Sequence, residues 1–318
     1  MALIKKYWFL AGLLLIFAVT LADFTETAAG AGRWFKAHQG PNAVIFIIFL
    51  FSGMVLEAEQ IKAGLRDVKG TLVALVVIYV FAPLLGLAFS WLPLEEGVIV
   101  GIFLVACMPT TLSSGVVMTG AAGGNIAHAL LITVVANSLA VLTVPVTLAL
   151  LLGGLGDGGA VHIDKGAIML KIAVFVFLPL ILGLLVKWSA NAVVSRFTFK
   201  LQVANQLFIL FIVWMAVSGA RETILQGAGS IGVIVVVSFV FHGMLLASAV
   251  AMIRLFSLGR GRREGVLFMG GQKTLTLAIL LQVSLFPQYG AALVVCVVHH
   301  IVHLMMDGYL VGRLNPGK

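Results

Sequence analysis

Long apolar runs dominate this sequence and recur along its whole length. Ten of them approach the roughly 20 residues that an α-helix needs to cross the hydrocarbon core of a bilayer. The sequence therefore predicts an all-α polytopic membrane protein with ten transmembrane helices. The runs cover Tyr7–Ala22, Ala43–Leu56, Thr71–Leu92, Gly97–Gly120, Ile126–Leu152, Ala167–Val186, Leu201–Ala220, Ser230–Phe256, Val266–Phe286 and Tyr289–Leu310.

The composition supports a chain that uses the lipid bilayer as its solvent. Only 10% of the residues are charged and 61% are hydrophobic, whereas soluble domains carry roughly 25% charged residues. The net charge of +8 comes from short clusters between apolar runs, so it does not form the single basic patch typical of nucleic-acid binding. Cys107 and Cys296 both lie inside apolar runs, so we expect neither a disulfide nor a metal framework.

Basic residues are unevenly distributed between the two sides of the predicted spans. With a cytoplasmic N-terminus, fourteen Lys and Arg residues fall on the cytoplasmic side and four on the other side. This bias predicts an inner-membrane protein with both termini in the cytoplasm. Lys5 and Lys6, followed by small residues near Ala22, could also mark a cleaved signal peptide, but the charge distribution favours retention of the first span.

The two halves of the chain resemble each other at an offset of about 160 residues. Met108–Ser113 aligns with Met269–Thr274, and Ala129–Val135 aligns with Ala292–Val298. Five spans per half would give the halves opposite orientations, as in inverted-repeat transporters. We therefore expect two five-helix repeats, residues 1–152 and 166–318, joined by a polar, glycine-rich linker at 153–165.

The fourth and ninth predicted spans both carry helix-breaking and polar residues in the middle of an apolar run. Such breaks are tolerated in hydrocarbon only where protein or a wet cavity satisfies the freed backbone groups, and a matched pair of them indicates a midplane binding site. The carbonyls at a break attract cations and the amides attract anions. The alternative is a simple kink with close helix packing. The residues are Pro109, Thr110, Thr111, Ser113, Ser114 and Gly115, and Gly270, Gly271, Gln272, Lys273, Thr274 and Thr276.

Lys273 is the most unusual residue of these breaks. An ammonium near the bilayer centre costs at least about 2.5–3.5 kcal/mol unless it is paired or solvated. Three roles are open: a built-in cation among helix C-termini, a proton carrier whose pKa is lowered by desolvation, or a ligand for an anionic substrate.

The last predicted span carries a group of ionisable residues. His300, His303 and Asp307 share one helical face, and His299 lies beside them. They would either form a proton relay in the cavity or cap the helix near the cytoplasmic surface. His128 and His242, alone on apolar helices, are interpreted as packing residues with one satisfied hydrogen bond each. Since Gly-x-Ser-x-Gly, phosphate-loop and His-Glu-x-x-His motifs are all missing, we expect no enzyme.

These motifs resemble a known family. Cys107–Ser114, followed by Thr119 and Gly123–Asn125, is similar to the fourth-helix motif of the bile acid:sodium symporter (BASS/SBF) family, and more narrowly to its SBF-like branch. Gln272–Leu277 resembles the ninth-helix motif of that branch, with Lys in the crossing. Leu178–Gly183 resembles the sixth helix, and His300-x-x-His303 the tenth.

The resemblance implies ten helices in a panel and a core domain, with broken fourth and ninth helices that cross. Ser114, Thr133 and Gln272 match the family's ion-binding positions. Asn137 is a further predicted substrate- or ion-binding residue. Four positions depart from the sodium-coupled pattern, which leaves the coupling ion open between sodium and a proton. They are Phe268 in place of glutamate, Gly115 in place of asparagine, Ala129 in place of serine and Ile78 in place of glutamine.

The sequence thus predicts a secondary transporter that moves a small organic anion together with sodium or a proton by alternating access. No cofactor is expected apart from the sodium ion. One alternative is a proton-linked exchanger or efflux carrier that uses Lys273 with the tenth-helix histidines. Another is a membrane regulator of ion homeostasis that transports no substrate. The sequence specifies neither the substrate, nor the direction of transport, nor the oligomeric state.

Overall fold

The computed structural model describes residues 2–55, 68–111, 113–153, 170–226 and 228–314. Every regular element in these ranges is a helix, which confirms the predicted all-α class. The predicted linker at 153–165 lies outside the described residues except for Gly153. The division into two sequence repeats, 1–152 and 166–318, remains a prediction.

Within the described residues the helices can be grouped into ten consecutive segments, each of which overlaps one predicted span. Some segments consist of one helix, and others of two or three short ones. In chain order they are α1 (Ala2–Leu21), α2 (Thr27–Ala37) with α3 (Gly40–Val55), α5 (Val68–Val76) with η1 (Val77–Phe81) and α6 (Ala82–Phe89), α7 (Glu96–Cys107) with α8 (Ser114–Ala121), α9 (Ile126–Gly153), η2 (Ala173–Phe177) with α11 (Leu178–Ser189), α12 (Asn191–Gln226), α13 (Ala228–Leu255), α14 (Arg262–Gly271) with α15 (Leu275–Leu285), and α16 (Gly290–Leu314).

Length and hydropathy mark fewer of these segments as complete membrane spans. Within the described residues, seven helices are long and apolar enough to cross a bilayer, or up to eight if the bent pair α2–α3 is one span. Ala11–Leu21 and Glu96–Cys107 are apolar but shorter. The structure therefore gives a polytopic membrane protein, and the number of ten crossings remains a prediction.

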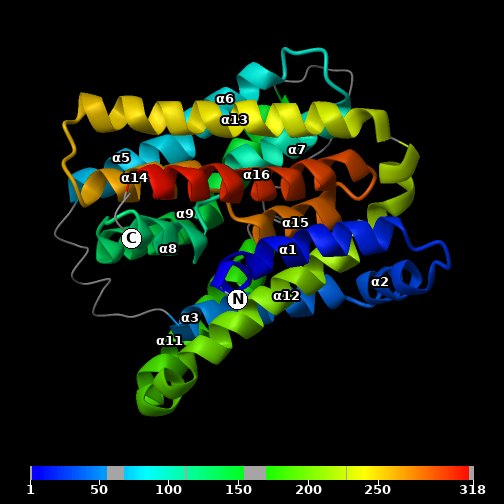
Figure 1. Cartoon of the computed structure of the whole chain (residues 1–318), viewed down its shortest axis with the longest axis horizontal. Helices are drawn as coiled ribbons and strands as arrows, with labels where there is room; N and C mark the ends of the chain where they lie inside the picture. Colours follow the sequence, from blue (N-terminus) through cyan, green and yellow to red (C-terminus); the bar gives the residue numbers. More distant parts are fainter. Residues whose placement is uncertain (1, 56–67, 112, 154–169, 227, 315–318) are drawn as a thin grey trace.

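The helices form two spatial groups, which Figure 1 shows one below the other. In the first group, α3 packs against α11 and α12, and α12 also packs against α1 and α2. In the second group, α14 packs against α5, α8 and α13, and α16 packs against α7 and α13. The second group contains both interrupted segments, α7–α8 and α14–α15.

Close backbone contact holds the first group together. A Cβ atom on Gly183 of α11 would lie 2.1 Å from the Leu50 carbonyl oxygen of α3, and one on Gly53 would lie 2.2 Å from the Leu180 carbonyl oxygen. Because lipid gives little hydrophobic drive for helix association, small residues that let backbones touch are a main source of packing in membranes. Gly53 and Gly183 therefore set the α3–α11 distance.

The side chains facing outward are those expected in lipid. Leu15, Leu150 and Val236 are each more than 60% exposed although they lie in apolar helices. Trp91 and Trp188, 80% and 84% exposed, lie just after α6 and near the end of α11. Tryptophan is enriched at membrane–water interfaces, so these two residues are consistent with the ends of spans.

Two parts of the fold differ from the prediction. Helix α2 was not predicted, because Gly30, Gly32 and the charged Arg33 interrupt any apolar run there; its axis makes an angle of 77° with that of α3. Helix α12 runs from Asn191 to Gln226, whereas only 201–220 was predicted. Its polar ends continue the helix beyond the apolar run.

Candidate functional site

The interruptions of the two broken segments lie against each other. Residues 108–113 separate α7 from α8, and residues 272–274 separate α14 from α15. The Thr274 amide donates a hydrogen bond to the Pro109 carbonyl oxygen at 3.0 Å. The two segments are thus broken at the predicted places and are joined there backbone to backbone.

Local chemistry explains both breaks. Pro109 disfavours a helical conformation of the residue before it, and Met108 is extended at φ −68° and ψ 145°. In α14, Gly270 and Gly271 have low helix propensity, and Gln272 after them is extended at φ −74° and ψ 144°. Each break therefore leaves a helix C-terminus buried in the protein and starts a new helix, at Ser114 for α8 and at Leu275 for α15.

The Lys273 ammonium lies among backbone carbonyls at the break. Its Nζ donates to the carbonyl oxygens of Ile78 at 2.9 Å, Met108 at 3.0 Å and Ala106 at 3.4 Å. The side chain is 3% exposed. Two of these acceptors are at the C-terminal end of α7, where the helix dipole favours a cation. Of the three roles considered for Lys273, this geometry favours the built-in cation.

The third acceptor is available because of a proline. In η1 the backbone bonds follow the i→i−5 register, in which the Ala82 amide donates to the Val77 carbonyl. The next donor in that register would be residue 83, but Pro83 has no N–H. The Ile78 carbonyl therefore lacks that partner and accepts from Lys273 instead. Pro83 thus leaves the Ile78 carbonyl available as an acceptor for the ammonium of Lys273, which lies 190 residues after Pro83 in the chain.

Uncharged oxygens gather around the side chain of Gln272. Its Oε1 accepts from Ser114 Oγ at 2.7 Å and from Thr111 Oγ1 at 2.8 Å. Thr133 Oγ1 lies 3.5 Å from the Thr111 carbonyl oxygen, and Asn137 Nδ2 donates to the Thr110 carbonyl at 3.2 Å. Helix α9 therefore braces the α7–α8 break. Carbonyl and hydroxyl oxygens are suitable ligands for a hard cation such as sodium.

A buried carboxylate lies on the other side of Gln272. Gln272 Nε2 donates to Asp307 Oδ2 at 2.8 Å, and His242 Nε2 lies 3.0 Å from Asp307 Oδ1. Both Asp307 and His242 have no exposed surface. Asp307 is therefore not an exposed cap at a helix end. His242 is a buried residue with one hydrogen-bonded ring nitrogen, which fits the packing role predicted for it, and its partner is this carboxylate.

The remaining histidines of α16 extend this polar region. The ring centroids of His300 and His303 are 4.5 Å apart, and those of His299 and His303 are 5.5 Å apart. His303 is fully buried with no hydrogen-bond partner for either ring nitrogen. No group of three or more His, Cys, Asp or Glu residues within the described ranges has the arrangement of a metal site.

A cavity of about 70 Å³ lies between the two helix groups beside the breaks. One water needs about 10–15 Å³ by the same measure, so the cavity admits several waters or a small polar group. The predicted residues that line it are Thr111, Ser113, Ser114, Thr274, Thr276 and His300. Residues from α1, α3 and α12 that were not predicted line it as well. Polarity inside apolar runs was the available signal for three of them, Ser52, Asn205 and Gln206.

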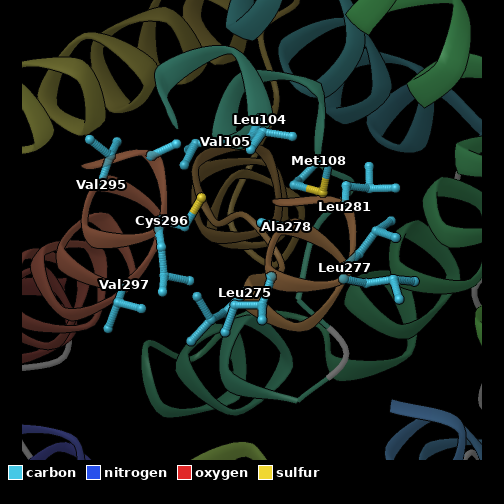
Figure 2. Packing of buried hydrophobic residues seen from close by; sticks show 14 of the residues in the cluster. Leu104, Val105, Met108, Leu275, Leu277, Ala278, Leu281, Val295, Cys296 and Val297 are labelled. Carbon is cyan, nitrogen blue, oxygen red and sulfur yellow. The ribbon is translucent and has the colours of Figure 1, made fainter. Parts of the chain in front are cut away.

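Apolar packing closes the region behind the breaks. Figure 2 shows Leu104, Val105 and Met108 next to Leu275, Leu277, Ala278 and Leu281 of α15 and Val295–Val297 of α16. A Cβ atom on Gly101 of α7 would lie 2.6 Å from Val295 Cβ, so α7 and α16 are in close contact. The polar groups of the breaks thus lie between a packed apolar wall and a small cavity.

A family model for the SBF-like CPA transporter family matches residues 7–316, nearly the whole chain. The chain belongs to this family. Since it is a family of transporters, the prediction of a transport protein that is not an enzyme is confirmed, as is the resemblance to BASS/SBF proteins.

Relatives from plants and animals agree with this family. The chain is 30% identical over 288 residues to the chloroplastic probable sodium/metabolite cotransporter BASS4 of Arabidopsis thaliana, and 28% identical over 286 residues to BASS4 of Oryza sativa subsp. indica. These matches cover 85% and 84% of this chain, but only 65% and 66% of the plant proteins. Sodium/bile acid cotransporter 7 of Xenopus tropicalis is 24% identical over 324 residues, which cover 98% of this chain and 92% of that protein.

The four positions expected to depart from the sodium-coupled pattern carry no side-chain oxygen. Phe268 and Ala129 are fully buried and carry no side-chain oxygen. A Cβ atom on Gly115 would lie 2.7 Å from Met269 Sδ, so no larger side chain fits there without a shift. Ile78 contributes only its backbone carbonyl, and it contributes that to Lys273. Side-chain oxygens at this place come from Gln272, Thr111, Ser114 and Thr133, and the buried oxygens Thr110 Oγ1 and Asn137 Oδ1 beside them have no hydrogen-bond partner.

Proposed function

We propose that this chain is a cation-coupled secondary transporter that moves an organic anion by alternating access at the meeting point of the α7–α8 and α14–α15 breaks. The single observation that carries the proposal is the backbone hydrogen bond from Thr274 to Pro109, which brings two helix C-termini and two helix N-termini together inside the protein. Such pairs of half-helices are the ion and substrate sites of secondary transporters.

The oxygen cluster supports coupling to sodium. Thr111 Oγ1 and Ser114 Oγ both lie within hydrogen-bonding distance of Gln272 Oε1. Hydroxyl groups can rotate so that their lone pairs face an ion, and all three groups would then be ligands. The relatives named sodium/metabolite and sodium/bile acid cotransporters favour the same ion.

The cavity supports an anionic substrate. Its lining includes no acidic residue within the described part of the chain, and it includes the starts of α8 and α15 through Ser114 and Leu275. Helix N-termini present free amides and a positive dipole end, both of which favour anions. At about 70 Å³ the cavity would admit only the anionic group, so the rest of the substrate requires the two helix groups to separate.

A proton-linked carrier is the second candidate. The observation in its favour is the run of buried histidines from the cavity residue His300 through His303 to His299. Histidine is the common side chain for proton transfer near neutral pH. The inner membrane and cytoplasmic termini remain part of the proposal.

Reconstitution into liposomes tests the proposal. Uptake of taurocholate, a bulky amphipathic anion, and of pyruvate, a small one, is measured with an inward sodium gradient, an inward proton gradient, or neither. Protein-free liposomes and the Lys273→Met variant are the controls. Accumulation driven by the sodium gradient supports the proposal, and accumulation driven only by the proton gradient supports the second candidate. If neither anion accumulates under either gradient, the proposed substrate class is wrong.

A further inference from the structure

The buried Asp307 carboxylate is not explained by the oxygen cluster or by the cavity. It has no exposed surface, and an isolated carboxylate is strongly disfavoured in such surroundings. Its two oxygens take different partners, Gln272 Nε2 at 2.8 Å and His242 Nε2 at 3.0 Å. Asp307 thus joins α16 to α13 and to the α14–α15 break.

The carboxylate determines which way the Gln272 amide faces. An ionised carboxylate can only accept hydrogen bonds, so the amide nitrogen must face Asp307. The carbonyl oxygen of the same amide must then face the opposite side, where Thr111 and Ser114 lie within 2.8 Å. If Asp307 were absent, the amide could rotate and place its nitrogen among those hydroxyls, which would repel a cation.

The carboxylate also adds negative charge near the oxygen cluster. A hydrogen bond to the Gln272 amide nitrogen polarises the amide, and inside a low-dielectric interior such effects are strengthened. The Lys273 ammonium, next in the chain to Gln272, donates to the carbonyls of Ile78, Met108 and Ala106 and not to Asp307. Within the described residues, Asp307 is thus the acidic side chain directly bonded to this cluster.

His242 keeps the carboxylate in place. Because the carboxylate only accepts, the Nε2 atom of His242 carries the proton in this contact. Its Nδ1 atom is buried and has no partner, and the ring packs near Gly271, where a Cβ atom would lie 3.4 Å from His242 Cε1. His242 is therefore fixed by α13 and by the end of α14.

We infer that Asp307, held by His242, is a positioning residue that makes the Gln272 carbonyl oxygen a ligand for the coupling cation. This inference rests on the proposed sodium-coupled function and deepens it. Asp307 acts through Gln272 and does not itself touch the ion. Partners of this kind around ion ligands typically change metal affinity by about 10- to 100-fold.

The test is a sodium titration of the purified protein. The thermal unfolding midpoint is followed as sodium replaces choline at constant ionic strength and constant pH, since an ion that binds only the folded state raises the midpoint. Asp307→Asn, which keeps the size but removes the charge, should require about 10- to 100-fold more sodium for half of the shift. His242→Gln, which keeps a donor for the carboxylate, should shift the requirement less than Asp307→Asn.

The matched control is Glu264→Gln on α14. Glu264 is also buried at 1% exposure, but its oxygens bind the Gly261 amide and Arg263 Nε. We expect this variant to respond to sodium like the wild type. If Asp307→Asn does not fold, the sodium requirement of His242→Gln is compared with that of Glu264→Gln. The inference predicts that His242→Gln needs more sodium for half of the shift than Glu264→Gln, and equal requirements overturn it.

The outcomes separate this inference from the proposed function. A sodium-responsive wild type with an unchanged Asp307→Asn, or with an equally weakened Glu264→Gln, overturns the inference alone. A wild type whose midpoint does not respond to sodium, while its uptake follows the proton gradient, overturns sodium coupling and with it the inference. A selective loss in Asp307→Asn supports both.

Discussion

Replacing Lys273 by methionine tests whether the buried ammonium stabilises the breaks of the two interrupted segments. The methionine stem keeps most of the volume and removes the three donors. The carbonyls of Ile78, Met108 and Ala106 would then be left without this partner inside the protein. We therefore expect loss of stability, although lysine is the residue that the bilayer disfavours.

The magnitude follows from the contact distances. The contacts at 2.9 and 3.0 Å are full hydrogen bonds and the one at 3.4 Å is weak. Hydrogen bonds from a charged group contribute about 1.5–3 kcal/mol each, so the two full bonds give about 3–6 kcal/mol. Removing the buried ammonium returns about 2.5–3.5 kcal/mol. The midpoints of these two ranges differ by about 1.5 kcal/mol, which is the expected loss in the free energy of unfolding.

The assay is reversible unfolding in mixed detergent micelles, followed by tryptophan fluorescence. Lys171→Met is the matched control, because Lys171 is partly exposed near the start of the sixth predicted span and the same substitution there removes no buried ammonium. We expect little change in the control. If Lys273→Met is as stable as the wild type, or no less stable than Lys171→Met, the ammonium does not support the break and the reasoning is refuted.

Three further predictions concern other parts of the chain. Pro83→Ala supplies the missing N–H for the Ile78 carbonyl, so in the Lys273→Met background it should restore about 1 kcal/mol of the free energy of unfolding. A double variant that is less stable than Lys273→Met would contradict this. Gly183→Ala places a Cβ atom against the α3 backbone and should cost about 1–3 kcal/mol, whereas Gly232→Ala, with nothing within 4 Å, should not; equal thermal midpoints would contradict the close contact. Asp23 accepts hydrogen bonds from the Ala29 amide and from Thr25, which lower its pKa below the ordinary value of 3.8. The stability that the ionised Asp23 adds is therefore fully present above pH 3.8 and is lost as the pH falls through the lowered pKa. The thermal midpoints of wild type and Asp23→Ala should therefore differ at neutral pH and converge in acid, and a constant difference would contradict the assignment.

The sequence was sufficient where local chemistry decides the structure. Pro109 and the Gly270–Gly271 pair interrupt their helices for reasons that lie within a few residues, and both breaks occur where they were predicted. The apolar runs likewise identify the helices, because in lipid each segment must satisfy its own backbone hydrogen bonds. Helix ends were less predictable, since polar residues at both ends of α12 continue the helix.

Long-range pairing explains what the sequence did not reveal. His242 and Asp307 are separated by 65 residues, and neither position alone distinguishes a packed histidine or a surface cap from a buried pair. The Ile78 carbonyl is free only because Pro83 falls in a π-helical register, and such a register is a property of the folded helix. The predicted residues Lys273 and His303 are buried among protein groups and do not line the cavity.

Accessibility of a cysteine at position 113 from the two sides of the membrane tests the proposed mechanism most directly. Ser113 is exposed and lines the cavity, whereas Cys107 and Cys296 are buried and give little background. Ser113→Cys is treated with a membrane-impermeant maleimide in right-side-out and inside-out vesicles, with and without sodium. Alternating access predicts labelling from both sides, with the favoured side changed by sodium. Labelling from one side only under every condition would contradict the mechanism.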